Sequence, residues 1–175
     1  MTDEKPKDSF LKSLIQVVGG AILIATAFRF LVGFTVQING ISMEPTFYHN
    51  EMVFSATYPV KLGNIKRGDI VIVKRTSEHE DVIKRILAIP GDTLEFSNDR
   101  VILNGKTLNE PYINKAESAF YPAMTYVLKE NEYFILGDNR GHSTDSRMYG
   151  PINKDTIRGV VKFRYYPFDR IGIIK

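Results

Sequence analysis

The sequence predicts a mostly β protein, built of antiparallel sheets and preceded by one apolar helix. An uncharged, mostly apolar stretch runs from Leu14 to Phe28. From Val36 onward, the apolar residues come in short runs bounded by turn signals. Short runs of this kind are typical of strands and not of helices. The 175 residues, 43% of them apolar, suffice for one domain with a core and a terminal segment.

The amino-terminal stretch is long enough to cross a membrane. After Arg29 the apolar character resumes as far as Phe34, so residues 13–34 supply the roughly 20 positions that a spanning helix needs. An arginine near one end can reach the headgroups. Three lysines precede the span, and basic flanks tend to remain inside. We therefore expect a cytoplasmic tail at 1–12 and a single-pass anchor of the cell membrane at 13–34.

Two other interpretations of this stretch stay open. Ala25-Thr26-Ala27 is a small-x-small pattern, which is typical of the cleavage site of a removable secretory signal. The apolar character continues past Ala27, which favours a retained anchor. A buried helix of a soluble domain is the third interpretation.

The rest of the chain is expected to form short strands joined by turns. Ile70–Val73 and Val82–Ile89 flank an acidic loop, Glu78 to Asp81, and are expected to pair. Asn104-Gly105 is the favoured pair for a type I′ hairpin turn. Residues 106–131 are more polar and irregular, which predicts a small excursion within an extracytoplasmic domain at 35–175. Further strands are expected at Thr93–Phe96, Val101–Leu103, Tyr133–Leu136, Val160–Tyr165 and Ile171–Ile174.

Composition argues against several functional classes. The net charge of +3 is small, and the basic residues of the protein are spread along the chain. No nucleic-acid partner is therefore expected. The absence of cysteine excludes disulfides, thiolate zinc sites and a cysteine nucleophile. The three histidines lack helical ligand spacing, and no metal or other cofactor is expected.

Two turn-rich segments and one lysine are candidates for chemistry. The segments are 39–46 and 137–147, and both follow predicted strands. Either alone could be an ordinary turn, because Gly, Asn, Asp and Ser are common turn residues. Lys84 interrupts an apolar strand between Ile83 and Ile86. Burial lowers the pKa of a lysine and makes it able to act as a base. A lysine on the solvent face of the strand is the plainer alternative.

Ser42 needs a base to become a nucleophile, and the residue types leave two options open. Lys84 is one, and a Ser-His-Asp triad with His142 and Asp145 is the other. A penicillin-binding Ser-x-x-Lys motif is absent, because Pro45 stands three residues after Ser42.

Four segments, taken in order, resemble type I signal peptidases, the bacterial leader peptidases with a Ser-Lys dyad. The segments are Gly40-Ile41-Ser42-Met43-Glu44-Pro45-Thr46, Arg67-Gly68-Asp69-Ile70-Val71, Ile83-Lys84-Arg85 with Pro90-Gly91-Asp92, and Gly137-Asp138-Asn139-Arg140 with Ser143, Asp145, Ser146 and Arg147. The resemblance covers essentially the whole chain and is nearest to the compact, single-anchor members. It implies a partly closed, barrel-like catalytic domain of antiparallel sheets.

The resemblance also implies a mechanism. Ser42 is expected to attack the carbonyl at the end of a signal peptide and to form an acyl-enzyme. Lys84 is expected to take the serine proton and later to activate water, with Ser143 hydrogen-bonded to its amine. Ion pairs that shape the Ser143 loop are expected from Asp138, Asp145, Arg85 and Arg147. The oxyanion and the substrate are expected to lie against Gly40, Ile41, Met43 and Ile83.

One residue departs from part of the family. Some members carry an oxyanion-donating serine where this chain has Gly40. The Ser42 backbone N–H is therefore the one donor that the resemblance supplies.

The expected substrates are exported preproteins, bound as an added strand and cleaved after Ala-x-Ala. The lipid bilayer is the other expected partner, and Phe47 is a candidate to insert into it. The protein is expected to be a monomer.

A non-catalytic paralogue that binds signal peptides is the main alternative function. A self-cleaving repressor-type peptidase would need a DNA-binding domain, and no helix-turn-helix pattern precedes Ser42.

Overall fold

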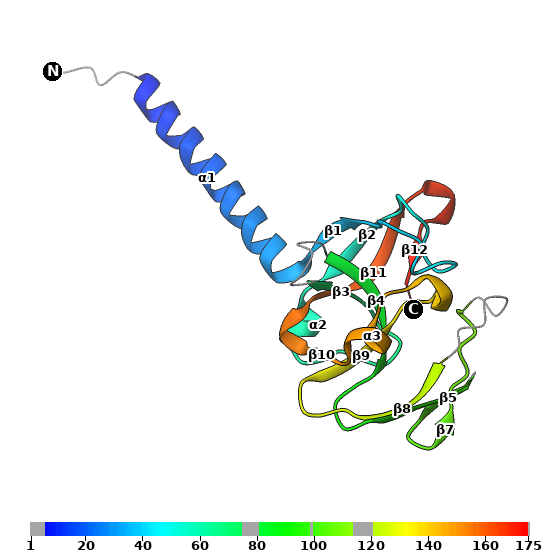
Figure 1. The fold of residues 1–175 in the computed structure, drawn as a ribbon. Coiled ribbons are helices and arrows are strands. Elements are labelled where there is room, and N and C mark those ends of the chain that lie inside the picture. Colours follow the sequence, from blue (N-terminus) through cyan, green and yellow to red (C-terminus); the bar gives the residue numbers. More distant parts are fainter. Residues whose placement is uncertain (1–5, 75–80, 99, 114–120, 175) are drawn as a thin grey trace.

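A long helix, α1 (Pro6–Val32), projects from a β domain (Figure 1). The computed structural model describes residues 6–74, 81–98, 100–113 and 121–174. Most of the acidic loop expected at Glu78–Asp81, including His79, and part of the excursion expected at 106–131 lie outside these residues.

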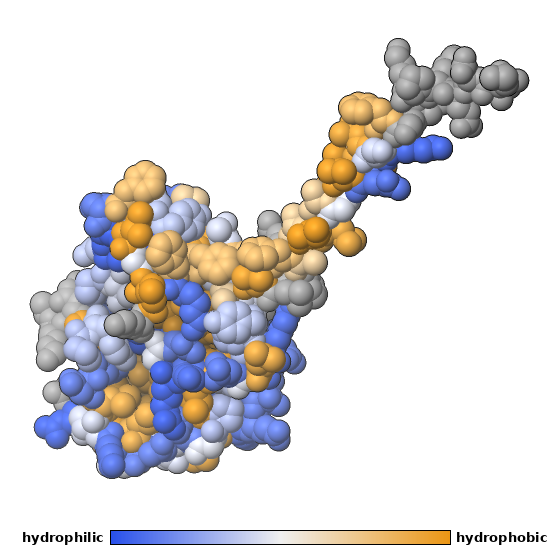
Figure 2. All heavy atoms as spheres, turned by 180° about the vertical axis from the view of Figure 1, so that it is seen from behind, coloured by the Kyte–Doolittle hydropathy of each residue, from blue (hydrophilic) through white to orange (hydrophobic). Residues whose placement is uncertain are grey.

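Helix α1 exposes its apolar side chains. Residues Phe10–Phe28 have a mean hydropathy of 1.8, and none of this stretch is buried inside the protein. Figure 2 shows apolar residues over much of its described surface. The stretch is therefore long and apolar enough to cross a membrane. It does not serve as the buried helix of a soluble domain, so that interpretation is wrong.

The helix ends two residues before the limit expected from hydropathy. Gly33 opens strand β1 (Gly33–Gln37), which pairs with β2 (Met52–Ala56). The two strands lie so close that a Cβ on Gly33 would be 2.1 Å from the Ser55 carbonyl oxygen. Only glycine fits there, so the approach of β2 sets the end of the helix.

The main sheet has eight strands and is antiparallel throughout. Its order is β1-β2-β11-β3-β4-β9-β10, with β12 paired to β11. The described strands form an open sheet, with β1 and β10 at its edges. The remaining strands are β3 (Ile70–Lys74), β4 (Asp81–Ala88), β9 (Glu132–Leu136), β10 (Ile152–Asn153), β11 (Ile157–Tyr166) and β12 (Gly172–Ile173). The mostly β, antiparallel fold class is confirmed, and so is the pairing of β3 with β4.

A second sheet lies between β4 and β9 in the sequence and below the main sheet in Figure 1. Its order is β7-β6-β5-β8. These strands are β5 (Thr93–Asn98), β6 (Arg100–Leu103), β7 (Lys106–Thr107) and β8 (Tyr121–Val127). Asn104 and Gly105 have φ values of 52° and 76°, so the predicted type I′ turn is confirmed. The sheet begins at Thr93 and is larger than the excursion expected at 106–131.

A shared core joins the two sheets. Phe134 of β9 is fully buried, with its ring centroid 5.5 Å from that of Phe96 and 4.8 Å from that of Tyr126. Leu87 and Leu94 belong to the same apolar cluster. The second sheet is therefore packed against the main sheet by side chains from both.

Asp92 fixes the turn that leads into the second sheet. Its carboxylate accepts hydrogen bonds from Ile89 N–H and Asn104 and pairs with Arg67. Burial raises the pKa of Asp92, but the bonds from Arg67, Ile89 and Asn104 outweigh it and lower the pKa below its usual value. The charged carboxylate is thus part of the folded structure.

Short helical turns complete the domain. They are α2 (Tyr58–Lys61), η1 (Arg140–His142), α3 (Ser146–Tyr149), η2 (Lys154–Thr156) and η3 (Phe168–Arg170).

Candidate active site

Ser42 and Lys84 meet at the surface of the main sheet. Lys84 Nζ lies 2.8 Å from Ser42 Oγ and 2.9 Å from the carbonyl oxygen of Ile83. Lys84 lies on β4, opposite Val71 of β3, and only 4% of it is exposed. The alternative of a solvent-facing lysine is therefore wrong. A separation of 2.8 Å allows direct proton transfer between the two groups.

The serine and the lysine line a hollow of about 270 Å³. One wall comes from Val36, Gln37 and Asn39, at and just after the end of β1, and the other from residues 81–84 of β4. An extended peptide could lie between these two walls, because each offers backbone groups along its length.

Ser42, the predicted nucleophile, belongs to a tight segment, residues 40–47, which we call the nucleophile turn. Glu44 N–H donates to Ile41 O at 3.1 Å, and Phe47 N–H donates to Met43 O at 2.9 Å. The side chains of Met43 and Phe47 are buried in the core beneath it. The prediction that Phe47 dips into lipid is therefore wrong.

Gly40 opens the nucleophile turn in a left-handed conformation. Its φ is +98°, which residues with a side chain rarely adopt. Its N–H donates to His49 Nδ1 at 3.2 Å. This backbone conformation accounts for glycine at the position where some signal peptidases carry serine.

The loop 137–147 packs against the nucleophile turn. Asn139 donates from its backbone N–H to Ser42 O at 3.1 Å and from Nδ2 to Ile41 O at 3.2 Å. A Cβ added to Gly137 would lie 2.4 Å from Ser42 O and 2.3 Å from Ser143 Oγ. Gly137 therefore lets Ser42 and Ser143 come within a few ångströms of each other.

Ser143 does not make the bond that the resemblance implied. Its Oγ is buried and has no hydrogen-bond partner among the residues that the structure describes. Lys84 Nζ instead faces Ser42 Oγ and Ile83 O. Ser143 lies near the Ser42 carbonyl, because a Cβ built on Gly137 would be 2.3 Å from Ser143 Oγ and 2.4 Å from Ser42 O.

Arg85 and Asp138 form a buried pair behind the dyad. Arg85 Nε and Nη2 lie 2.8 and 2.6 Å from the two carboxylate oxygens, and the side chains are only 6% and 0% exposed. Arg85 also donates to Gly68 O at 2.9 Å. Asp138 accepts a hydrogen bond from the Thr46 hydroxyl. The pair thus ties β4, the loop and the nucleophile turn together.

Arg147 and Asp145 form the second expected pair. Arg147 Nε and Nη2 lie 2.8 and 2.9 Å from the carboxylate. Asp145 also accepts from Gly137 N–H at 3.0 Å, and Arg147 donates to Ser143 O at 3.2 Å. This pair holds both ends of the loop that carries Ser143.

Glu110 and Tyr112 support the site and were not predicted. Arg140 donates to Glu110 at 3.0 Å and to Gly137 O at 3.0 Å, and Tyr112 OH donates to Glu110 at 2.7 Å. The Tyr112 ring lies 4.0 Å from the Arg85 guanidinium. Burial and the neighbouring Glu110 charge raise the pKa of Tyr112. Glu110 and Arg140 are 30 positions apart in the sequence, so no local pattern indicates this contact.

The two described histidines, His49 and His142, have other contacts. His142 Nδ1 lies 3.3 Å from Asn139 Oδ1, and His49 binds the Gly40 N–H. The basic side chain that contacts Ser42 Oγ is Lys84. Within the described ranges, no three acidic or histidine side chains gather in a way that could hold a metal ion.

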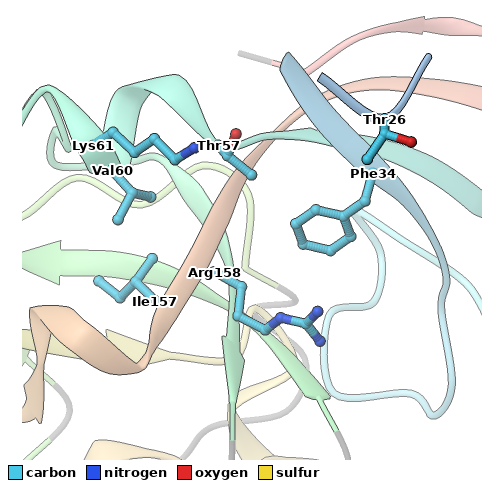
Figure 3. Close-up of a pocket in the computed structure, with 7 residues that line it drawn as sticks. All are labelled: Thr26, Phe34, Thr57, Val60, Lys61, Ile157 and Arg158. Atoms are coloured by element: carbon cyan, nitrogen blue, oxygen red, sulfur yellow. The ribbon is translucent and has the colours of Figure 1, made fainter. Parts of the chain in front are cut away.

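A larger hollow, of about 540 Å³, lies away from the dyad. Figure 3 shows Thr26 of α1 and Phe34 of β1 on one side, with Lys61 of α2 on the other and Arg158 between them. It contains neither Ser42 nor Lys84 and is distinct from the hollow described above.

Residues 11–166 match the family described as signal peptidase, peptidase S26. The chain is 32% identical to signal peptidase IB of Staphylococcus aureus over 93% of its length and 92% of the relative. It is also 32% identical to signal peptidase I P of Bacillus subtilis subsp. natto, over 96% of both chains. A crystal structure of a signal peptidase I from Enterococcus faecalis is similar with 30% identity and a TM-score of 0.48, covering 55% of this chain and 95% of the other.

Proposed function

Because the chain belongs to the signal peptidase family, peptidase S26, whose members are serine endopeptidases that remove signal peptides, we propose that it does so through a Ser42–Lys84 dyad. The observation that carries this proposal is the 2.8 Å contact between Lys84 Nζ and Ser42 Oγ. A serine hydroxyl becomes a strong nucleophile only when a neighbouring base takes its proton.

The contact between Lys84 Nζ and Ser42 Oγ supports the following acylation step. Neutral Lys84 accepts the proton of Ser42 as Oγ attacks the scissile carbonyl carbon. The Ser42 backbone N–H stabilises the oxyanion. Lys84 then gives the proton to the leaving amine, which releases the mature protein and leaves the signal peptide as an ester on Ser42.

Deacylation repeats these roles with water. Lys84 takes a proton from the water that attacks the ester, and Ser42 regains its hydroxyl proton as the signal peptide leaves. Ser143 lies beside the Ser42 carbonyl and can turn its hydroxyl towards the amine during the cycle. Turnover should rise as the pH increases, because the base acts in its neutral form.

The substrate enters as an extended strand between Val36–Asn39 and residues 81–84. Main-chain hydrogen bonds supply affinity, and the modest hollow of about 270 Å³ admits small side chains. Ala-x-Ala sites fit this selection. Helix α1 anchors a monomeric enzyme in the cell membrane with its amino terminus in the cytoplasm, which concentrates it near membrane-held preproteins.

The test is cleavage of a purified precursor with an Ala-x-Ala site in detergent or lipid. Wild type should cut after the second alanine, whereas Ser42→Ala and Lys84→Ala should be inactive. His142→Ala is the matched control and should retain most activity. Loss of cutting in His142→Ala together with activity in Lys84→Ala would favour a histidine base. An inactive wild type that still binds the precursor would favour the non-catalytic paralogue.

A further inference from the structure

The carboxyl-terminal segment reaches back to the nucleophile turn through two arginines. Arg164 of β11 donates from Nη1 to the Thr46 carbonyl oxygen at 2.9 Å. Arg170 of η3 donates from Nη2 towards the carbonyl oxygens of Pro45 and Thr46, both at 3.4 Å. Arg164 Nε also donates to Arg170 O at 2.6 Å, which joins the two elements. Two cations from the end of the chain therefore hold carbonyls that follow Ser42 by three and four residues.

A buried carboxylate organises these arginines. Glu51 is only 3% exposed. Its Oε2 lies 3.0 Å from Arg164 Nη1, and its Oε1 lies 2.6 Å from Arg170 Nη1. A carboxylate removed from water is stabilised by cationic partners, and these contacts restrict the positions of both guanidiniums. The nearby rings of Phe47 and Tyr48 lie 5.6 and 4.5 Å from the Arg164 and Arg170 guanidiniums, respectively.

Thr46 is held by hydrogen bonds at both its backbone carbonyl and its side-chain hydroxyl. Its carbonyl oxygen accepts from Arg164 and Arg170, whereas its hydroxyl donates to Asp138, the partner of Arg85. The backbone between Thr46 and Ser42 is a single tight turn, so it has little freedom to absorb a shift at one end. A displacement of Thr46 therefore moves the Ser42 hydroxyl relative to Lys84 on β4.

We propose that Glu51, Arg164 and Arg170 are positioning residues, which hold the nucleophile turn so that Ser42 Oγ stays within proton-transfer distance of Lys84. This inference rests on the proposed function of the dyad. None of the three lines the hollow between β1 and β4. They should therefore affect the chemical step and leave substrate affinity nearly unchanged.

The test measures kcat and KM of the full-length enzyme on an Ala-x-Ala precursor, together with the thermal unfolding midpoint. Glu51→Gln keeps the shape of the side chain and removes its charge. A misplacement of about 1 Å at a reacting group can cost about 100-fold in rate. We expect kcat to fall about 10- to 100-fold in this variant while KM changes less than about twofold.

Arg170 provides a second test, because it is part exposed and its variants are less prone to unfold. Arg170→Ala should lower kcat, and Arg170→Lys should recover part of the loss, since lysine keeps the charge beside Glu51. Lys162→Ala is the matched control. It lies on β11 and pairs with Asp69 at 3.6 Å, away from the turn, and should behave as wild type.

Each outcome bears on one proposal. Folded Glu51→Gln and Arg170→Ala variants with wild-type kcat would overturn the positioning role. The dyad would still stand if wild type cleaves and Lys84→Ala does not. A parallel rise in KM, or no recovery by Arg170→Lys, would also refute it. An inactive wild type would refute the function, and the inference with it.

Discussion

Gly137→Ala should strongly lower the activity of the enzyme, with only a moderate loss of stability. The new Cβ would lie 2.4 Å from Ser42 O, about 1 Å short of an ordinary contact of 3.4 Å. The other close neighbours are Ser143 Oγ at 2.3 Å and Ser143 Cβ at 2.5 Å, so the methyl group cannot avoid the site. Overpacking typically costs about 1–3 kcal/mol of stability. The same 1 Å shift, passed to Ser42, can cost about 100-fold in kcat.

The assay is steady-state cleavage of an Ala-x-Ala precursor, with urea unfolding of the same samples. Gly172→Ala is the matched control, because a Cβ there meets nothing within 4 Å. We expect wild-type kcat in the control and a loss of about two orders of magnitude in Gly137→Ala. A folded Gly137→Ala variant with wild-type kcat would refute the argument that the glycine makes room for the dyad.

Three further predictions concern the scaffold. The lowered pKa of Asp92 means that its ion pair with Arg67 adds stability above the unfolded pKa of about 4, which is lost as pH falls through the folded value. Asp92→Asn should thus flatten the stability difference between pH 7 and pH 3 in urea unfolding. Arg85→Ala should lower the free energy of unfolding by about 3–5 kcal/mol, because it leaves Asp138 buried and unpaired. The double variant Arg85→Ala/Asp138→Ala should lose less than the sum of the two single variants. Phe134→Ala should cost about 3–5 kcal/mol in the same assay, because its ring joins the two sheets.

Local features of the fold were predictable from the sequence. The Asn104-Gly105 turn depends on two neighbouring residues, and the pairing of β3 with β4 depends on two adjacent apolar runs. The end of α1 was predicted two residues late because it depends on contact between Gly33 and β2. The excursion was predicted to begin at residue 106, whereas the second sheet begins at Thr93. The prediction began too late because β5 pairs with β8, which lies more than twenty residues further along the chain.

The site was predictable where a residue type is unusual for its surroundings. Lys84 interrupts an apolar strand, so the sequence alone predicts it as a candidate base. The resemblance supplied the ion-pair residues around the loop. It did not reveal Glu110 or Glu51, because a buried carboxylate and an exposed one look alike in sequence. Their arginine partners lie far away in the chain.

The position of the second sheet has an evolutionary consequence. Strands β4 and β9 are neighbours in the main sheet, with Ile86 opposite Ile135. Residues 89–131 therefore form one long connection between two adjacent antiparallel strands of the main sheet. Insertions or deletions within this connection need not alter the spacing of Ser42 and Lys84. We expect differences in length among relatives to gather there, with selection acting on the apolar face that meets Phe134 and on Glu110 and Tyr112, which contact Arg140 and Arg85.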